Sequence, residues 1–179
     1  MKNVYVQDKA KTTFDTLKGT FGYTNVMQTP KILKVIVSAT TGSVKDAKKK
    51  VLIGDRLAKI TGQKASETAA KKSIATFKVR EGDPVGYRVT LRGPRMNDFL
   101  NKLVHIAFPR TRDFRGLDIK GLDAMGNYTV GIKENSVFPE CSDEELKDVF
   151  GMAVTVVTNS KDKAETKALL EHLGFLFKK

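Results

Sequence analysis

The chain has 179 residues, of which 40% are hydrophobic, and it carries a formal net charge of +12. This composition predicts one globular domain, and the single cysteine excludes an internal disulfide and agrees with a reducing cytosol. No apolar run reaches the roughly 18–20 residues that a transmembrane helix needs, and residues 1–8 lack the apolar core of a signal peptide.

The first third of the chain is predicted to hold two helices and a strong strand. Residues 5–20 show the spacing of an amphipathic helix, and a glycine follows it. The β-branched run in Lys31–Ser38 predicts a strand. Ser43 or Asp46 is then expected to cap an amphipathic helix that continues through Ile60.

A β-hairpin is predicted next, with strands at Phe77–Arg80 and Tyr87–Arg92 and the Glu81–Gly86 loop between them. The second strand alternates apolar and polar residues, as the strand of a half-buried sheet does. The apolar residues are Tyr87, Val89 and Leu91, and the polar ones are Arg88, Thr90 and Arg92. Asn97–Phe108 is expected to be a helix that Pro109 ends.

The remainder is predicted to alternate loops with short elements. They are a loop-rich segment 109–123, strands at Tyr128–Ile132 and Met152–Val157, an acidic helical turn at Ser142–Leu146 and a helix at Ser160–Leu173. The order of elements favours an α+β fold, because hairpins occur and strict β-α-β alternation does not. We therefore expect a two-layer domain over residues 1–179, with the hairpin tip 77–87 and the loop 109–127 projecting. Its mainly antiparallel sheet of about five strands would carry helices on one face and leave the other open to RNA.

The sequence offers no catalytic pair, metal site or cofactor motif. The two histidines, His105 and His172, lie in predicted helices, and neither a G-x-S-x-G elbow, a Walker motif nor a G-x-G-x-x-G motif occurs. Cys141 has no His or Cys near it in sequence that would suggest a metal site or an activated thiolate. The acidic run 143–148 has the composition of a solvated face more than that of a cation site. We expect no enzyme, metal or cofactor.

The distribution of charge points to a polyanionic partner instead. Residues 1–115 carry 24 Lys or Arg and 9 Asp or Glu, whereas residues 116–179 carry 8 and 11. The cations near the predicted hairpin are Lys64, Lys71, Lys72, Lys78, Arg80, Arg88 and Arg92. Double-stranded RNA is recognised mainly by shape, phosphate and 2′-hydroxyl contacts, which a flat basic sheet face with Ser38, Gln63 and Thr90 could supply. The alternative is an ordinary solvent-exposed sheet face.

Two loops allow further partners. The Glu81–Gly86 tip is either a plain connector or a contact for a second RNA. In the loop Arg110–Arg115, Asp113 is expected to hold one guanidinium while the others face a partner, or else to form an ion pair that only fixes the loop.

Several motifs resemble, in order and at matching spacing, the family of bacterial large-subunit ribosomal protein number five. They are Phe21–Gln28, Leu57–Lys64, Thr68–Ser73, Phe77–Gly82, Pro84–Gly86, Val89–Gly93, Pro109–Leu117, Gly126–Tyr128, Phe138–Glu140 and the C-terminal Gly174–Lys179. The resemblance implies a structural, cytoplasmic component of the central protuberance that binds 5S and 23S rRNA and neighbouring ribosomal proteins, without a membrane or a homo-oligomer. Two alternatives to a ribosomal protein stay open: a free-standing basic RNA chaperone or regulator, and an RNA-modifying enzyme.

The resemblance also implies three groups of contacts. The 5S rRNA-binding group is Ser38, Gln63, Lys64, Lys71, Lys72, Arg88, Thr90 and Arg92. The group for the tRNA in the peptidyl site is Phe77, Lys78, Arg80, Glu81, Gly82, Asp83 and Pro84. The group for a bridge to small-subunit protein thirteen is Arg110, Arg112, Asp113, Phe114, Arg115 and Glu140. The chain departs from the family most clearly at Ser38, where the family usually has an amide side chain with a longer reach.

Overall fold

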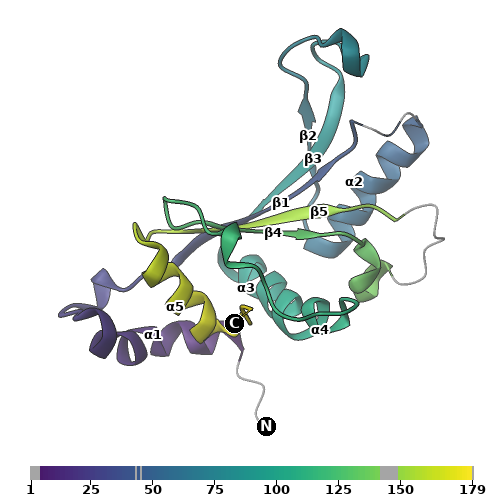
Figure 1. Ribbon diagram of the computed structural model, residues 1–179. Coiled ribbons are helices and arrows are strands. Elements are labelled where there is room, and N and C mark those ends of the chain that lie inside the picture. The colour runs from purple at the N-terminus through teal and green to yellow at the C-terminus, as the bar shows by residue number, and fades with distance from the viewer. Residues whose placement is uncertain (1–4, 43, 45, 142–148, 179) are drawn as a thin grey trace. The chain divides into compact units, whose positions relative to one another are not determined.

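The computed structural model describes residues 5–42, 44, 46–141 and 149–178, which fall into two compact units (Figure 1). Unit 1 comprises Met1–Val35, Arg92–Val130 and Thr155–Lys179, and unit 2 comprises Ile36–Leu91 and Gly131–Val154. Ser43 and the acidic segment 142–146, for which a cap and a helical turn were predicted, lie outside the described residues. The single-domain expectation stays a prediction. Among the described helices, none is long and apolar enough to cross a membrane.

Five strands form one sheet in the order β2-β3-β1-β5-β4. Their bounds are β1 Ile32–Thr40, β2 Ser66–Ala69, β3 Pro84–Leu91, β4 Tyr128–Ile132 and β5 Met152–Thr158. The alternation predicted for the hairpin is confirmed, because Tyr87, Val89 and Leu91 are buried while Arg88 is exposed. The antiparallel, open sheet and its helices confirm the α+β class.

The α-helices of the described residues are α1 Val6–Phe21, α2 Ala47–Thr61, α3 Gly93–Lys102, α4 Phe108–Arg110 and α5 Lys163–Leu173. Local signals account for the two ends of α2. The Asp46 carboxylate accepts the backbone N–H of Lys48 at 2.9 Å, which confirms one of the two predicted caps of α2. Gly62 follows α2 with φ of 67°, a left-handed conformation that glycine adopts without a steric cost.

The predicted hairpin has the wrong first strand. Phe77 lies in a 3-10 turn, and Val79 forms only an isolated bridge with Ile74. The partner of β3 is β2, with Ser66 opposite Arg88 and Glu67 opposite Tyr87. Figure 1 shows these two strands extending as a long hairpin, and the segment between them, residues 70–83, is the hairpin tip from here on.

The helix predicted over 97–108 is longer at both ends. It begins at Gly93, with Pro94 in the first turn, where a missing N–H costs nothing. A π-helical turn, Leu103–Ala107, then joins α3 to α4, and the Phe108 N–H donates to the Leu103 carbonyl five residues back. Because this wider turn changes the hydrogen-bonding register, Pro109 is accommodated in α4 and does not end the helix, contrary to the prediction.

Unit 1 has an aromatic core. In this unit α1 packs against α5 and α3. The Tyr128 ring meets Phe175 and Phe177 edge-on, with centroids 6.4 and 5.3 Å apart, and its hydroxyl donates to the Asp118 carbonyl at 3.2 Å. Burial and, to a lesser degree, the charge of Asp118 raise the pKa of Tyr128 to about 12, so its hydroxyl remains a donor. Phe175 is thereby fixed in the core, and the half-buried Phe177 is held at its edge.

Candidate nucleic-acid interface

A row of polar side chains crosses three strands on the open face of unit 2. Ser66 lies opposite Arg88 in the β2–β3 ladder. The Thr41 N–H donates to the Val85 carbonyl at 2.8 Å, and in an antiparallel ladder this bond places Ser38 opposite Arg88 on the other side. Arg88 is exposed and Ser38 half-buried. The structure therefore brings two of the predicted site residues side by side and adds Ser66, which the sequence reasoning missed.

Gln63 and Thr90 are joined directly. The Gln63 Nε2 donates to the Thr90 carbonyl at 3.4 Å. Gln63 is fixed at the exit of α2, because the Thr61 hydroxyl donates to the Gln63 carbonyl at 3.1 Å and to Leu57 one turn back at 2.7 Å. Within the described part of the chain, no group bonds the Gln63 Oε1 or the Thr90 hydroxyl. One acceptor and one hydroxyl thus remain for a ligand at this end of β3.

The opposite side of β3 supports this face. The Tyr87 ring packs so closely on α2 that a Cβ at Gly54 would lie 2.9 Å from it. The Tyr87 hydroxyl donates to the Glu67 carboxylate at 3.3 Å, and burial, followed by the charge of Glu67, raises the pKa of this tyrosine. Helix α2 therefore holds β3 rigidly from behind, while Arg88 and Thr90 remain on the open face.

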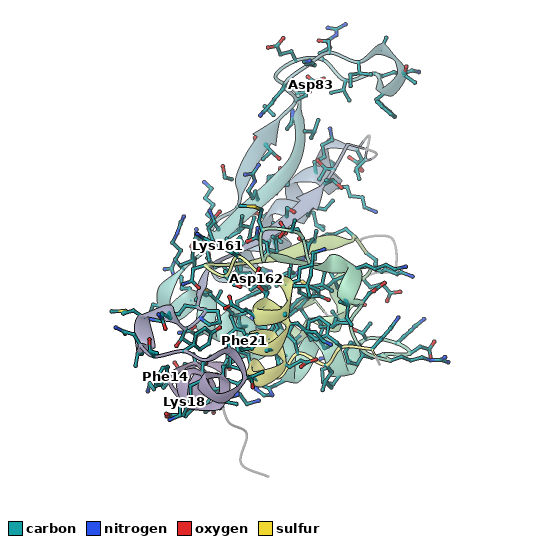
Figure 2. The ribbon with its side chains drawn as sticks, turned by 60° about the vertical axis from the view of Figure 1, so that its left-hand side comes forward. Phe14, Lys18, Phe21, Asp83, Lys161 and Asp162 are labelled. Carbon is teal, nitrogen blue, oxygen red and sulfur yellow. The ribbon has the colours of Figure 1, made fainter. Side chains whose placement is uncertain are left out.

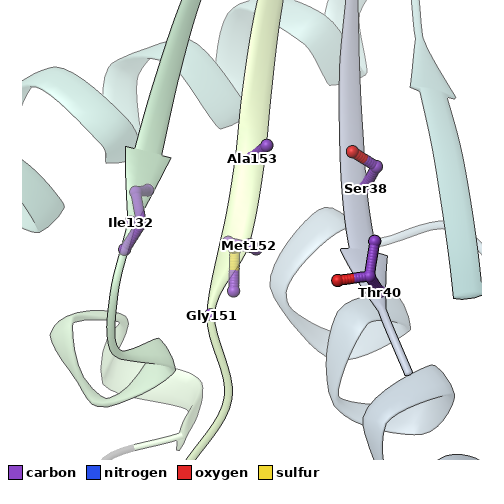
Figure 3. Close-up of a pocket in the computed structure, with 6 residues that line it drawn as sticks. All are labelled: Ser38, Thr40, Ile132, Gly151, Met152 and Ala153. Carbon is purple, nitrogen blue, oxygen red and sulfur yellow. The ribbon is translucent and has the colours of Figure 1, made fainter. Parts of the chain in front are cut away.

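A hollow of about 370 Å³ adjoins Ser38 (Figure 3). Its lining residues are Ser38 and Thr40 of β1, Ile132 of β4, Gly151, which precedes β5, and Met152 and Ala153 at the start of β5. Hydroxyl groups from β1 and apolar groups from β4 and β5 share this surface, a combination that suits the face of a ribose or nucleobase. The sequence reasoning missed Thr40 and Ala153, although strand alternation applied to β1 and β5 would have indicated them.

The hairpin tip is ordered by its own hydrogen bonds. The Ala70 N–H donates to the Asp83 carbonyl at 2.9 Å, and the Gly82 N–H donates to Ala70 at 3.0 Å. The Asp83 carboxylate accepts the Arg80 N–H at 2.8 Å, and Figure 2 labels this aspartate in the hairpin. Phe77 is 72% exposed and is followed by Lys78 in a left-handed conformation, φ 51°. The tip thus presents an aromatic ring to solvent.

Two of the cations grouped with Thr90, Lys71 and Lys72, lie in the hairpin tip, and their part in 5S rRNA binding stays a prediction, as does that of Arg92. Lys71 and Lys72 are exposed in the tip, beyond the end of β2 that is farther from Gln63 and Thr90. Arg92 is exposed at the start of α3, after β3 has ended. Lys71 and Lys72 are near Thr90 in sequence only, because an antiparallel hairpin carries the residues of its tip away from the other end of its strands. Pro84, expected in the tip, is the first residue of β3.

The bridge group is divided between the units. The arginine loop, Arg110–Arg115, belongs to unit 1, and Glu140 is exposed in the turn Pro139–Cys141 of unit 2. Asp113 is exposed with φ of 51°, and in the described residues it forms no ion pair with Arg110, Arg112 or Arg115. The predicted holding of a guanidinium by Asp113 is therefore wrong for this structure.

No group of three or more His, Cys, Asp or Glu side chains that could hold a metal ion occurs in the described ranges, which leave out residues 142–148. Cys141 is buried. The surface consists of guanidinium, ammonium, hydroxyl and amide groups, which bind by charge and hydrogen bonds. Its chemistry is that of a binding face.

Comparison with known proteins gives a family. Residues 25–80 match the family model "Ribosomal protein L5", and residues 84–177 match the model of the C-terminus of the same ribosomal protein family. Large ribosomal subunit protein uL5 of Desulfotalea psychrophila is 50% identical over 164 residues, which cover 91% of this chain and 92% of that protein. The protein of the same name from Trichlorobacter lovleyi is 44% identical over 179 residues, 99% of this chain and 98% of its own. This chain therefore belongs to the ribosomal protein L5 family of the large ribosomal subunit.

Proposed function

We propose that this chain, a structural and non-enzymatic constituent of the cytoplasmic ribosome's large subunit, binds 5S rRNA through the open face of unit 2. The observation that carries the proposal is the bond from Gln63 to the Thr90 carbonyl beside the row Ser66, Arg88 and Ser38. Cationic, amide and hydroxyl groups therefore lie together on one flat surface. They match the phosphates, base edges and 2′-hydroxyls that an RNA helix presents across its minor groove.

Each group has a distinct task in this proposal. The guanidinium of Arg88 binds phosphate oxygens, and the exposed Lys64 adds a second charge next to Gln63. The Thr90 hydroxyl and the Gln63 amide meet ribose hydroxyls or base edges. Ser38 contributes at short range only, and the hollow beside it admits part of a nucleotide. Recognition thus combines phosphate contacts that position the protein with polar contacts that select the RNA.

The salt dependence of 5S rRNA binding tests which cations take part. With Arg88 and Lys64 alone on the face, affinity is expected to fall about tenfold between 50 and 200 mM salt, since two phosphate contacts give a slope near −2. The basic residues of the tip would raise this loss to roughly a thousandfold if they joined the same contact, for about six contacts in all. Calorimetric titration of purified 5S rRNA at several salt concentrations measures the slope.

An unrelated RNA hairpin of similar length is the control for this titration. If the protein binds both RNAs equally at every salt concentration, the 5S proposal fails and a general RNA chaperone becomes the better description. Binding that prefers 5S rRNA with a slope near −2 supports the sheet face as the contact.

We propose a separate role for the hairpin tip, which is contact with the tRNA in the peptidyl site. Its self-bonded backbone presents Phe77 and the cations Lys78 and Arg80 to solvent. An exposed ring can stack on a base, a contact that contributes about 1–3 kcal/mol. Phe77→Ala is therefore expected to weaken retention of peptidyl-site tRNA by about tenfold or more in filter binding to ribosomes. Unchanged tRNA retention, or reduced 5S rRNA affinity in the same variant, would contradict this division of roles.

We infer that Glu140 faces the small subunit, where the resemblance implies protein thirteen as partner. Glu140 is an exposed residue on the turn Pro139–Cys141. A basic ribosomal protein would be attracted to this carboxylate, because complementary charges steer association. The arginine loop, assigned by the same resemblance to the bridge, has the opposite sign of charge and would repel such a partner.

A further inference from the structure

We propose that the arginine loop, Arg110–Arg115, binds RNA phosphates and forms a second RNA contact, in unit 1, that does not depend on the 5S rRNA-binding face. The loop carries three arginines and one aspartate. The proposal departs from the family resemblance, which implies a protein partner for this loop. Three observations support it: the backbone of the loop is fixed, its arginines form no ion pair among the described residues, and its one aromatic ring is already packed against the core.

The loop is held at its beginning and its middle. The Thr111 N–H donates to the Phe108 carbonyl, and the Thr111 hydroxyl donates to Ala107, each at 3.1 Å. The Phe114 ring stacks on Phe108, with centroids 5.8 Å apart and planes 6° from parallel. Phe108 in turn meets the buried Phe175 edge-on at 5.7 Å. The aromatic core of unit 1 therefore fixes the centre of the loop.

The C-terminal segment holds the end of the loop. The Leu117 N–H donates to the Leu176 carbonyl at 2.7 Å, and the Lys178 N–H donates to the Leu117 carbonyl at 2.9 Å. The backbones are so close that a Cβ at Gly116 would lie 2.9 Å from the Lys178 nitrogen. This pairing brings the backbone of another exposed lysine beside the loop. A loop fixed in this way loses little conformational freedom when it binds a ligand.

The cations of the loop are not neutralised within the described structure. Arg110, Arg112 and Arg115 are exposed, and none forms an ion pair there. Exposed arginines without a printed ion pair occur elsewhere in the described chain as well, for example Arg88, so the feature that distinguishes this loop is that three of them follow one another within six residues on a fixed backbone. The arginine loop thus combines three exposed guanidinium groups, without an ion pair among the described residues, with a backbone that is held at its beginning, middle and end. Such a site is suited to an anionic partner.

RNA fits this site better than an acidic protein does. A protein interface needs an apolar centre, and Phe114, the one aromatic residue of the loop, is already stacked on Phe108. Guanidinium groups bind phosphate in a bidentate manner, and this contact requires no apolar surface. In a ribosomal protein, rRNA is the abundant neighbouring polyanion. Charge and surface composition therefore both favour phosphate as the ligand.

Photocrosslinking in assembled ribosomes distinguishes the two partners. A benzoylphenylalanine placed at Leu176, which is 66% exposed and whose backbone pairs with Leu117, leaves all three arginines and the Thr111 hydroxyl in place, and ribosomes that contain the full chain are irradiated. The expected adduct joins the protein to RNA. Ribonuclease should therefore remove its slow-migrating band from a gel, and protease digestion should leave a peptide that is still attached to RNA. An adduct that resists ribonuclease and contains a second protein overturns the proposal, as does the absence of any adduct.

A charge-removal series gives an independent measurement. Large subunits depleted of this protein serve as the probe, and rebinding is measured from 50 to 200 mM KCl. The triple variant Arg110→Gln, Arg112→Gln, Arg115→Gln is expected to reduce the salt slope by about two to three. The matched triple Arg→Lys variant keeps the charges and should retain the slope. An unchanged slope in the glutamine variant overturns the proposal, whereas failure of the 5S rRNA proposal would be detected separately in the Arg88 variant.

Discussion

Arg88→Gln is expected to weaken 5S rRNA binding by about 1.5–3 kcal/mol, roughly 10- to 150-fold, the contribution typical of a hydrogen bond to a charged group. Arg88 lies at the centre of the polar row, between Ser66 and Ser38 on the neighbouring strands. Because Tyr87 is packed on α2, the backbone of β3 cannot easily move to bring another cation to the same phosphate. Calorimetric titration with 5S rRNA at constant salt measures the loss.

The matched control for Arg88→Gln is the double variant Lys71→Gln, Lys72→Gln. It removes two positive charges instead of one, yet both lysines lie in the hairpin tip. The control is expected to change 5S rRNA affinity by no more than about twofold, because exposed charges beyond a Debye length of about 10 Å are largely screened at 0.1 M salt. If the double variant loses more affinity than Arg88→Gln, the RNA binds the tip and the sheet-face proposal is wrong.

Gly86→Ala is expected to lower the free energy of unfolding by about 1–3 kcal/mol, the usual range when an atom is forced into a packed site. Gly86 is buried in β3, and a Cβ there would lie 2.8 Å from the Ala39 carbonyl oxygen and 3.2 Å from the Thr68 hydroxyl. Since Ala39 contributes a backbone atom, β3 and β1 would have to separate. 5S rRNA affinity should fall with stability, because the same two strands carry Arg88 and Ser38.

Gly131→Ala is the matched control for this substitution. Gly131 is also a strand glycine, in β4, but it is exposed and a Cβ there meets nothing within 4 Å. Its substitution is expected to be neutral or to stabilise by up to about 1 kcal/mol, since alanine restricts the unfolded chain. Urea unfolding followed by circular dichroism suits this chain, which has no tryptophan. Equal midpoints for the two variants would show that β3 and β1 tolerate the methyl group.

The choice of strand partner shows where sequence reasoning fails. Phe77–Arg80 alternates apolar and basic residues and has the composition of a strand, yet Phe77 lies in a 3-10 turn. The actual partner, Ser66–Ala69, has four small or polar residues and weak strand propensity. It becomes a strand because it completes the ladder of β3, with Ser66 opposite Arg88. Pairing depends on contacts between distant residues, so the composition of the segment alone did not reveal it.

The same dependence on distant residues explains why only part of the candidate site could be predicted from the sequence. Gln63 and Thr90 were proposed as polar groups of the basic sheet face and by resemblance, and the structure brings them into a hydrogen bond. Lys71 and Lys72 were grouped with them because they are near in sequence, and the hairpin places them at its far end. Nothing in the sequence around Ser66 indicated a binding role, because its position beside Arg88 depends on the register in which β2 pairs with β3.

The sequence by itself determined the properties that depend on local patterns. These are the alternating faces of β3, the Asp46 cap and Gly62 stop of α2, the basic character of residues 1–115, and the family. Only the tertiary structure decided which strand pairs with β3, which cations share a surface with Thr90, and that the arginine loop has no internal ion pair among the described residues. The physical reason is that periodicity and capping act within a few residues, whereas pairing, burial and charge compensation depend on residues that only folding brings together.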